Sequence, residues 1–205
     1  MKLHLHEAGD GDRLALLIHG GMSDHRTWHA VERRLIGLGY RVVDSLPAGA
    51  DLAIGHSLGG LSLALALARL RPRRAVFSDP GFRLGNLPAG ALAVMRSMVE
   101  TASPASIRTA NPRWSEADVA AEVAGFARFD LSFLDGVGGF EEDYLPRAPI
   151  VPTLVQLADP SLTIGPTTAG LLEQRGFDVT VVPGAGHCIH RDDLPAFFAS
   201  LAGWV

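Results

Sequence analysis

The chain has 205 residues, 47% of them hydrophobic and 20% charged, which is typical of one globular domain with a sizeable core. Its net charge of −4 argues against nucleic acid or an anionic membrane as a partner, because both need a basic face. No stretch approaches the roughly 20 apolar residues of a membrane span, and the alternating N-terminus lacks the apolar run of a signal peptide. The single Cys188 excludes an intrachain disulfide and fits a reducing compartment. We therefore expect a cytoplasmic protein in which Cys188 is a small buried side chain.

Strand patterns alternate with helix patterns along the first part of the chain. Residues 2–7 alternate in polarity like a half-buried strand, and residues 14–18 form a continuous apolar run, as in a strand covered on both faces. Ser23 or Asp24 can cap a helix that Gly39 ends. The same reasoning predicts strands at 41–43, 51–54 and 74–78, and a helix at 61–68.

Residues 80–149 carry no strand pattern. They show helical spacing at 91–99, and Ser115-x-x-Asp118 is the capping box of a second helix. Further on we expect strands at 153–158 and 179–182, and helices at 167–175 and from Asp192 onward. The alternation predicts an α/β fold, with a mainly parallel sheet of about seven strands and helices on both faces. In such sheets ligands bind outside the carboxyl ends of the strands.

The segment Gly55-His56-Ser57-Leu58-Gly59-Gly60 lies between a predicted strand and a predicted helix. It matches the G-x-S-x-G pattern of a sharp strand-to-helix turn that presents a serine hydroxyl above the sheet edge. Gly55 and Gly59 lack the Cβ atoms that would collide in so tight a turn. The helix that begins there directs free N–H groups and a positive dipole end toward the site. We predict that Ser57 is a nucleophile.

Two further polar residues follow later strands. Asp159 comes after the strand that ends at Ala158, and His187 lies in the loop after the last strand. With Ser57 they give the chain order Ser, Asp, His. Together with Leu17-Ile18-His19-Gly20-Gly21, Leu157-Ala158-Asp159-Pro160 and Gly184-Ala185-Gly186-His187, this order resembles an α/β-hydrolase-fold serine hydrolase of the esterase and lipase type. The matching motifs span nearly the whole chain.

The chemistry of such an enzyme suggests a role for each residue. His187 would take the proton of Ser57 as the hydroxyl attacks a carbonyl, and Asp159 would orient the imidazole. The backbone N–H groups of Leu58 and Gly21 would form the oxyanion hole, with Met22 as the alternative second donor.

Other residues compete for some of these roles. Asp79, after the neighbouring strand, could supply the carboxylate, and His190 could replace His187 as the base. His25 and His29 have the i, i+4 spacing of a metal pair, but a third ligand is not evident, so we expect no metal and no cofactor. His19 and His56 flank the site, where we expect packing or hydrogen-bonding roles.

The resemblance implies a single hydrolase domain over residues 1–205, with a helical cap inserted at about 80–149. Side chains of this cap could line an apolar pocket over Ser57 or form the core of the cap itself. The predicted pocket residues are Met22, Met95, Met98 and Phe126, with Trp114, Phe129 and Phe133 as further candidates.

The connection between the strands at 41–43 and 52–56 departs from the family pattern, which has a loop and a full helix there. Only Asp44–Asp51 remains, whereas a parallel crossover ordinarily needs about a dozen residues. Either this hydrolase is minimal or a segment is absent from the sequence. With the helix missing, exposed apolar surface could favour a homodimer over a monomer.

These features predict a serine hydrolase that cleaves small, mainly apolar carboxylic esters or lactones through an acyl-enzyme. The alternatives are a C–C bond hydrolase, perhydrolase or lyase on the same scaffold, because a fold does not fix a reaction. A non-catalytic ligand-binding member of the fold is the other alternative. In each case the expected partner is a small molecule.

Overall fold

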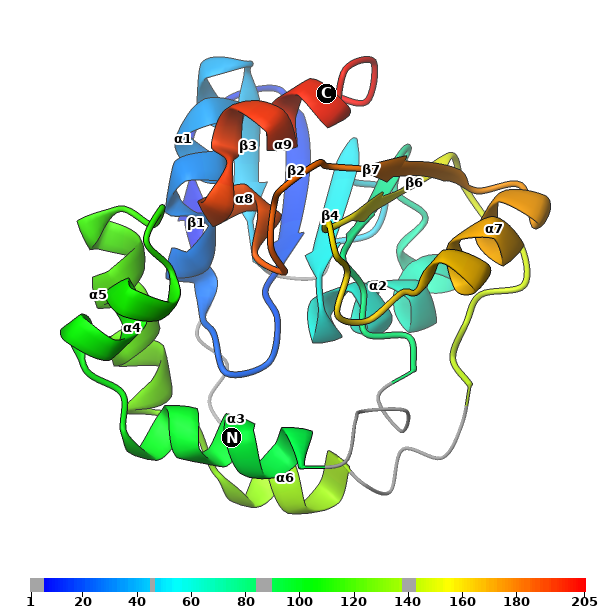
Figure 1. Ribbon diagram of the computed structural model, residues 1–205. Helices are drawn as coiled ribbons and strands as arrows, with labels where there is room; N and C mark the ends of the chain where they lie inside the picture. Colours follow the sequence, from blue (N-terminus) through cyan, green and yellow to red (C-terminus); the bar gives the residue numbers. More distant parts are fainter. Residues whose placement is uncertain (1–5, 45–46, 84–89, 138–142) are drawn as a thin grey trace.

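The computed structural model describes residues 6–44, 47–83, 90–137 and 143–205. Its centre is a seven-stranded sheet with the order β1-β3-β2-β4-β5-β6-β7, in which β1 is antiparallel to β3 and every other neighbouring pair is parallel (Figure 1). The strands are β1 (Glu7–Ala8), β2 (Arg13–Ile18), β3 (Tyr40–Val43), β4 (Leu52–His56), β5 (Ala75–Ser78), β6 (Thr153–Leu157) and β7 (Asp178–Val181). The predicted fold is confirmed. The strand predicted at 2–7 appears only as β1, and residues 1–5 lie outside the described part of the chain.

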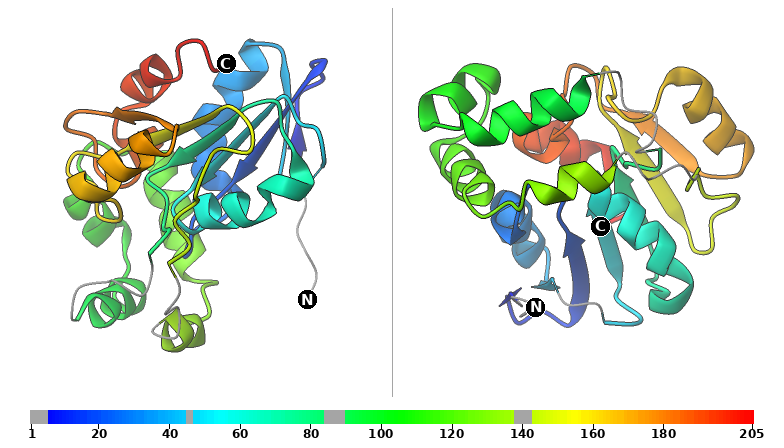
Figure 2. Two further views of the ribbon diagram at one scale, coloured as in Figure 1. Left: turned by 90° about the vertical axis from the view of Figure 1, so that its right-hand side faces the viewer. Right: turned by 90° about the horizontal axis from the view of Figure 1, so that it is seen from below.

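Helices pack on both faces of the sheet (Figures 1 and 2). One face carries η1 (His25–Trp28), α1 (His29–Gly37), α8 (Ile189–Asp192) and α9 (Leu194–Ser200), and the other carries α2 (Leu58–Leu70) and α7 (Pro166–Gln174). The alternation along β4 shows how the two faces are built. Leu52 and Ile54 pack into the cluster under α1 and α9, whereas Ala53 packs into the cluster under α2 and α7.

Between β5 and β6 the described residues form α3 (Ala91–Glu100), α4 (Pro104–Ala110), α5 (Glu116–Phe126) and α6 (Ser132–Val137). These four helices, called the cap here, lie beyond the carboxyl ends of the central strands, and α5 contacts η1, one of the helices that cover the sheet (Figures 1 and 2). The predicted capping box at the start of α5 is present, because the Ser115 hydroxyl accepts from the Asp118 N–H and the Asp118 carboxylate accepts from the Ser115 N–H.

The connection from β3 to β4 is short, as the sequence indicates. Its described residues, 44 and 47–51, contain no helix. The Asp51 N–H donates to the Leu14 carbonyl oxygen at 2.8 Å, and the Leu14 N–H donates to the Asp51 carboxylate at 2.8 Å. Ala50 is buried in the same cluster as Leu16. This end of the connection therefore covers part of the sheet face where the family pattern has a helix.

Candidate active site

Ser57 occupies the sharp turn between β4 and α2. Its φ of 54° and ψ of −121° lie where non-glycine residues are rare, and its side chain makes no capping bond to α2. Backbone contacts hold this geometry, because the Ser57 N–H donates to Ser78 and the Ser57 carbonyl accepts from Gly60, Leu61 and Gly81. The Ser57 hydroxyl is therefore not used to cap α2.

The glycines around this turn are required by close backbone contacts. A Cβ atom on Gly59 would lie 2.4 Å from the carbonyl oxygens of Ile18 and His19, and one on Gly55 would lie 2.5 Å from the carbonyl oxygen of Gly59. Glycine thus lets the first turn of α2 approach the end of β2.

The loop after β2 lies beside the start of α2. A Cβ atom on Gly20 would be 3.1 Å from the Ser57 Cβ, and one on Gly21 would be 3.5 Å from the Leu58 Cδ2. Leu58 is the first residue of α2, so its N–H lacks the helical carbonyl partner that later residues have. Met22 continues the loop in the left-handed region, with φ 63°. The structure thus brings the predicted oxyanion residues Gly21 and Leu58 together next to Ser57.

His187 contacts Asp79 and not Asp159. Its Nδ1 atom lies 2.5 Å from the Asp79 Oδ2, and the Asp79 side chain is fully buried. Asp159 is exposed, and its carboxylate accepts a bond from the Gly184 N–H at 3.3 Å. The predicted partnership of Asp159 with His187 is therefore wrong, and the competing residue Asp79 takes that place. The physical reason is the strand order, since β5 lies next to β4 and one strand closer to Ser57 than β6 does.

His56, directly before the nucleophile candidate, holds the backbone of His187. Its Nε2 lies 2.9 Å from the His187 carbonyl oxygen, which can only accept, so Nε2 carries the proton. Desolvation by burial lowers the pKa of His56 well below the ordinary value, and the neighbouring His187 lowers it further. His56 therefore stays neutral and donates to this carbonyl. The sequence indicates a hydrogen-bonding role for His56 but not this partner.

The other histidines have different surroundings. His190 is buried, its Nε2 lies 3.0 Å from the Thr27 Oγ1, and its ring lies against Trp28. Burial lowers the pKa of His190 well below its ordinary value. The His29 Nδ1 lies 2.9 Å from the Arg26 carbonyl oxygen, and His25 stacks on His6. Within the described ranges, no group of three or more His, Cys, Asp or Glu side chains is arranged to hold a metal ion.

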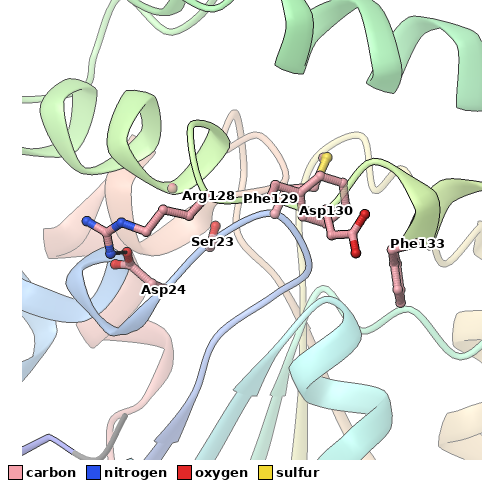
Figure 3. Close-up of a pocket in the computed structure, with 8 residues that line it drawn as sticks. Ser23, Asp24, Arg128, Phe129, Asp130 and Phe133 are labelled. Atoms are coloured by element: carbon pink, nitrogen blue, oxygen red, sulfur yellow. Dashed lines mark hydrogen bonds and ion pairs between the residues drawn. The ribbon is translucent and has the colours of Figure 1, made fainter. Parts of the chain in front are cut away.

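An open hollow of about 320 Å³ lies between the cap and the loop after β2 (Figure 3). Arg128 and Asp24 lie together at one side of it, and Asp130 and Phe133 lie toward the other. Its lining residues are Met22, Ser23, Asp24, Gly125, Arg128, Phe129, Asp130 and Phe133.

The predicted pocket residues divide between this hollow and other parts of the cap. Met22 lines the hollow, but Met95, Met98 and Phe126 do not. Phe126 packs instead into a small cluster with Ile107, Trp114 and Val119, and Met98 is exposed on α3. Their place in a pocket over Ser57 stays a prediction, because Ser57 itself does not line this hollow. Helical spacing identifies an apolar side of a cap helix, but it does not tell whether that side faces the cap's own core or a hollow.

Polar side chains attach the cap to the segment that follows His187. The Arg191 side chain is 2% exposed, and its Nη1 lies 2.6 Å from the Glu122 Oε2 on α5. Its Nε lies 3.6 Å from the Asp118 Oδ1, and its guanidinium lies over the Trp114 ring. The Trp114 Nε1 in turn donates to Asp192 at 2.9 Å. Desolvation raises the pKa of Glu122, although Arg191 opposes that rise.

Cys188 is half-buried next to the same cluster. Desolvation raises the pKa of its thiol to about 12. The thiol is therefore protonated at neutral pH, as expected of a side chain with a packing role.

Comparisons with solved structures show the same fold in several enzymes. N-formylmaleamic acid deformylase from Pseudomonas putida S16 is 19% identical, with 96% of this chain and 95% of that chain covered and a TM-score of 0.72. An esterase from Exiguobacterium antarcticum is 14% identical, with coverage of 98% and 94% and a TM-score of 0.72. A bromoperoxidase from Bacillus anthracis is 17% identical, with coverage of 98% and 94% and a TM-score of 0.73.

A comparison with curated proteins finds no match in sequence. In the described part of the chain, no helix combines the length and apolarity needed to cross a bilayer. The family model described as the alpha/beta hydrolase family matches residues 19–201. This match, together with the strand-to-helix turn at Ser57 and the sheet order, shows that the chain belongs to the alpha/beta hydrolase family.

Proposed function

We propose that the protein is a serine hydrolase that cleaves small, mainly apolar carboxylic esters or lactones. Ser57 is the nucleophile, His187 the general base and Asp79 the carboxylate that orients His187. The observation that carries this proposal is the 2.5 Å contact between His187 Nδ1 and the buried Asp79, on the strand next to the one that presents Ser57. A carboxylate at Nδ1 fixes the tautomer in which Nε2 can accept a proton.

The reaction follows from these positions. His187 Nε2 takes the proton of the Ser57 hydroxyl as the oxygen attacks the ester carbonyl carbon. The N–H groups of Leu58 and Gly21 stabilise the resulting oxyanion. When the carbon–oxygen bond to the leaving group breaks, His187 returns the proton to the departing alcohol. Water activated by the same histidine then cleaves the acyl-enzyme and restores Ser57.

The hollow beside Met22 is evidence that the substrate has a small, mainly apolar acyl group. It begins one residue after Gly21, and Met22, Phe129 and Phe133 contribute apolar surface. Binding sites for small molecules are commonly concave and mainly apolar, with few polar groups. Of its three charged lining residues, Asp24 and Arg128 are paired with each other at 3.3 Å, and the Asp130 carboxylate accepts from the Ser132 N–H at 3.0 Å, so none of them requires a charged ligand.

Covalent labelling tests the nucleophile. A fluorophosphonate probe should label the native protein once, at Ser57, and the protein should hydrolyse a short-chain p-nitrophenyl ester. Ser57→Ala should abolish both while leaving the circular dichroism spectrum unchanged, because the hydroxyl makes no capping bond. A folded native protein that resists labelling but melts at a higher temperature with an added ester would instead indicate a binding protein. Labelling without ester turnover would favour C–C hydrolase, perhydrolase or lyase chemistry.

Matched variants test the carboxylate. Asp79→Asn should lower kcat by about 10⁴-fold, because an amide at this place favours the wrong histidine tautomer. Asp159→Asn should leave kcat within about twofold, because Asp159 is exposed and contacts the Gly184 backbone instead of His187. A large loss from Asp159→Asn with little effect of Asp79→Asn would reverse the assignment.

A further inference from the structure

Ser161 contacts the side of Asp79 that His187 does not use. The Ser161 Oγ lies 2.5 Å from the Asp79 Oδ1, whereas His187 contacts Oδ2. Ser161 belongs to the loop after β6, two residues beyond Asp159. The loop after the neighbouring strand thus reaches the buried carboxylate through a side chain that belongs to none of the sequence motifs.

The direction of this hydrogen bond follows from the other contacts of Ser161. Its Oγ accepts from the Ile164 N–H at 3.0 Å and from the Thr163 N–H at 3.3 Å. A hydroxyl has one proton and two acceptor positions. Both acceptor positions are occupied by N–H groups, and two oxygens remain near the hydroxyl, the Asp79 Oδ1 at 2.5 Å and the Thr163 Oγ1 at 3.5 Å. The single proton of Ser161 is donated to Asp79, because the carboxylate is the closer and the charged acceptor.

Two donors therefore fix the Oδ1 atom of Asp79. The Ala158 N–H donates to it at 3.2 Å, in addition to the Ser161 hydroxyl. Bonds to an ionised acceptor are shorter and stronger than neutral ones, so this pair holds the carboxylate firmly. With Oδ1 held in place, the plane of the carboxylate is set and Oδ2 faces His187 Nδ1.

We propose that Ser161 is a positioning residue for catalysis, which holds Asp79 so that Asp79 can orient His187. This inference rests on the proposed serine hydrolase function. The loop after β6 then has a different role from the predicted one, in which its Asp159 orients His187. That loop does not supply the carboxylate through Asp159, but it holds the carboxylate that β5 supplies.

Ser161→Ala should lower kcat for a p-nitrophenyl ester by about 10-fold to 100-fold, because small misplacements of catalytic groups have effects of this size. KM should stay within about twofold, because Ser161 does not line the hollow. Ser161→Thr keeps the hydroxyl and should recover most of the loss. The matched control is Thr163→Val, which removes a hydroxyl 3.5 Å from the Ser161 Oγ but keeps the N–H that donates to Ser161 and the bond from Ser161 to Asp79. It should match the native enzyme.

A double-mutant cycle separates positioning from a general structural role. If Ser161 acts through Asp79, Ser161→Ala should cause no further loss of kcat in the Asp79→Asn background. Equal losses in both backgrounds would overturn the positioning role and leave the serine hydrolase proposal intact. If Asp79→Asn itself has no effect on kcat, the assignment of Asp79 as the carboxylate that orients His187 is wrong.

Proton NMR gives a readout that does not depend on turnover. The imidazole proton of His187 that is hydrogen-bonded to Asp79 should resonate at low field and disappear in Asp79→Asn and His187→Ala. In Ser161→Ala this resonance should shift or broaden while the melting temperature stays near that of the Thr163→Val control. An unchanged resonance would show that Ser161 does not position the carboxylate.

Discussion

The sheet and the cap are held together in different ways. Each face of the sheet carries one large buried apolar cluster, and its glycines permit backbone contacts that a single Cβ atom would block. The cap has one small cluster around Trp114 and Phe126, and α3 has no buried residue. Polar contacts through Arg191 and Trp114 attach it to the segment after His187. Close packing therefore fixes the backbone around Ser57, whereas a few specific side chains hold the cap.

The sheet and the cap should differ most in stability and activity when one methyl group is added to each of them. Gly59→Ala places a Cβ 2.4 Å from two backbone oxygens, and neither oxygen belongs to a flexible side chain. We expect loss of activity and destabilisation of about 3 kcal/mol or more, which is the upper range for overpacking. Gly136→Ala in α6 meets no atom of the described residues within 4 Å and should raise the free energy of unfolding by about 0.5–1 kcal/mol.

Urea unfolding and ester hydrolysis measure both variants. A stable and active Gly59→Ala enzyme would contradict the view that backbone contact at the turn sets the site. A strongly destabilised Gly136→Ala enzyme would show that the cap is packed as closely as the sheet.

A similar loss of stability, with a smaller loss of activity, is expected from removing the buried cation between the two regions. Arg191→Met removes the ion-pair partner of the nearly buried Glu122 and one of the cations beside the buried Asp118, which keeps its contacts with Ser115 and His29. Breaking a buried ion pair costs about 3–5 kcal/mol when one charge stays behind, although protonation of Glu122 would offset part of this. Removing the attachment of the cap should also raise KM more than it lowers kcat.

The control for this variant lies in the cap itself. Arg108→Met breaks an exposed ion pair with Glu116 and should cost at most about 1 kcal/mol. Limited proteolysis, together with thermal melting, should show cleavage within residues 90–137 of Arg191→Met before cleavage of the sheet. Simultaneous loss of cap and sheet would mean that the two regions unfold as one unit.

The smallest effect on stability is expected at Asp24, which caps η1 and forms an ion pair with Arg128 of the cap. Partial burial alone would raise the pKa of Asp24, but hydrogen bonds from Arg26 outweigh it and lower the pKa to about 2. A lowered pKa stabilises the fold above the ordinary value of 3.8, and this contribution is lost as the pH falls through about 2. Linkage sets an upper limit of about 2 kcal/mol, and solvent screening of this partly exposed carboxylate lowers the contribution toward about 1 kcal/mol.

Asp24→Asn should therefore destabilise the protein at pH 7 by about 1–2 kcal/mol, and the difference should shrink as the pH falls below about 4. Asparagine keeps the capping oxygen, so the comparison isolates the charge. Thermal melting at several pH values measures it, with the exposed Asp135→Asn as a nearly neutral control. A difference that stays constant with pH would mean that lost packing, and not lost charge, causes it.

Features that depend on neighbouring residues were predictable from the sequence. The turn at Ser57, the buried strands and the capping box at Ser115 each need residue types at fixed short spacings, and the structure contains all three. The short helices α4, α6 and α8 were not predicted. Each has seven residues or fewer, so apolar periodicity has too few positions to emerge.

The choice between Asp79 and Asp159 depends on the tertiary structure. Both follow a strand, so the sequence alone does not distinguish them. What decides is the position of the loop that carries His187. That loop contacts the backbone of Asp159, because the Asp159 N–H donates to Ala185, and places the imidazole over β5. The aspartate that contacts His187 is therefore determined by the strand order and the path of the loop, and the spacing of residues along the sequence does not reveal either.

The short connection from β3 to β4 has a consequence for the strand between them. β3 and β4 both pair with β2 and lie about 10 Å apart, two strand spacings, and Asp44–Asp51 joins them. We expect this short connection to limit how far β3 and β4 can move apart on either side of β2. The two hydrogen bonds between Asp51 and Leu14 attach its end to the start of β2. The amide protons of β2 should therefore exchange with solvent more slowly than those of the edge strand β7. We therefore expect the loop of Gly21, which follows β2, to be anchored at the most slowly exchanging part of the sheet.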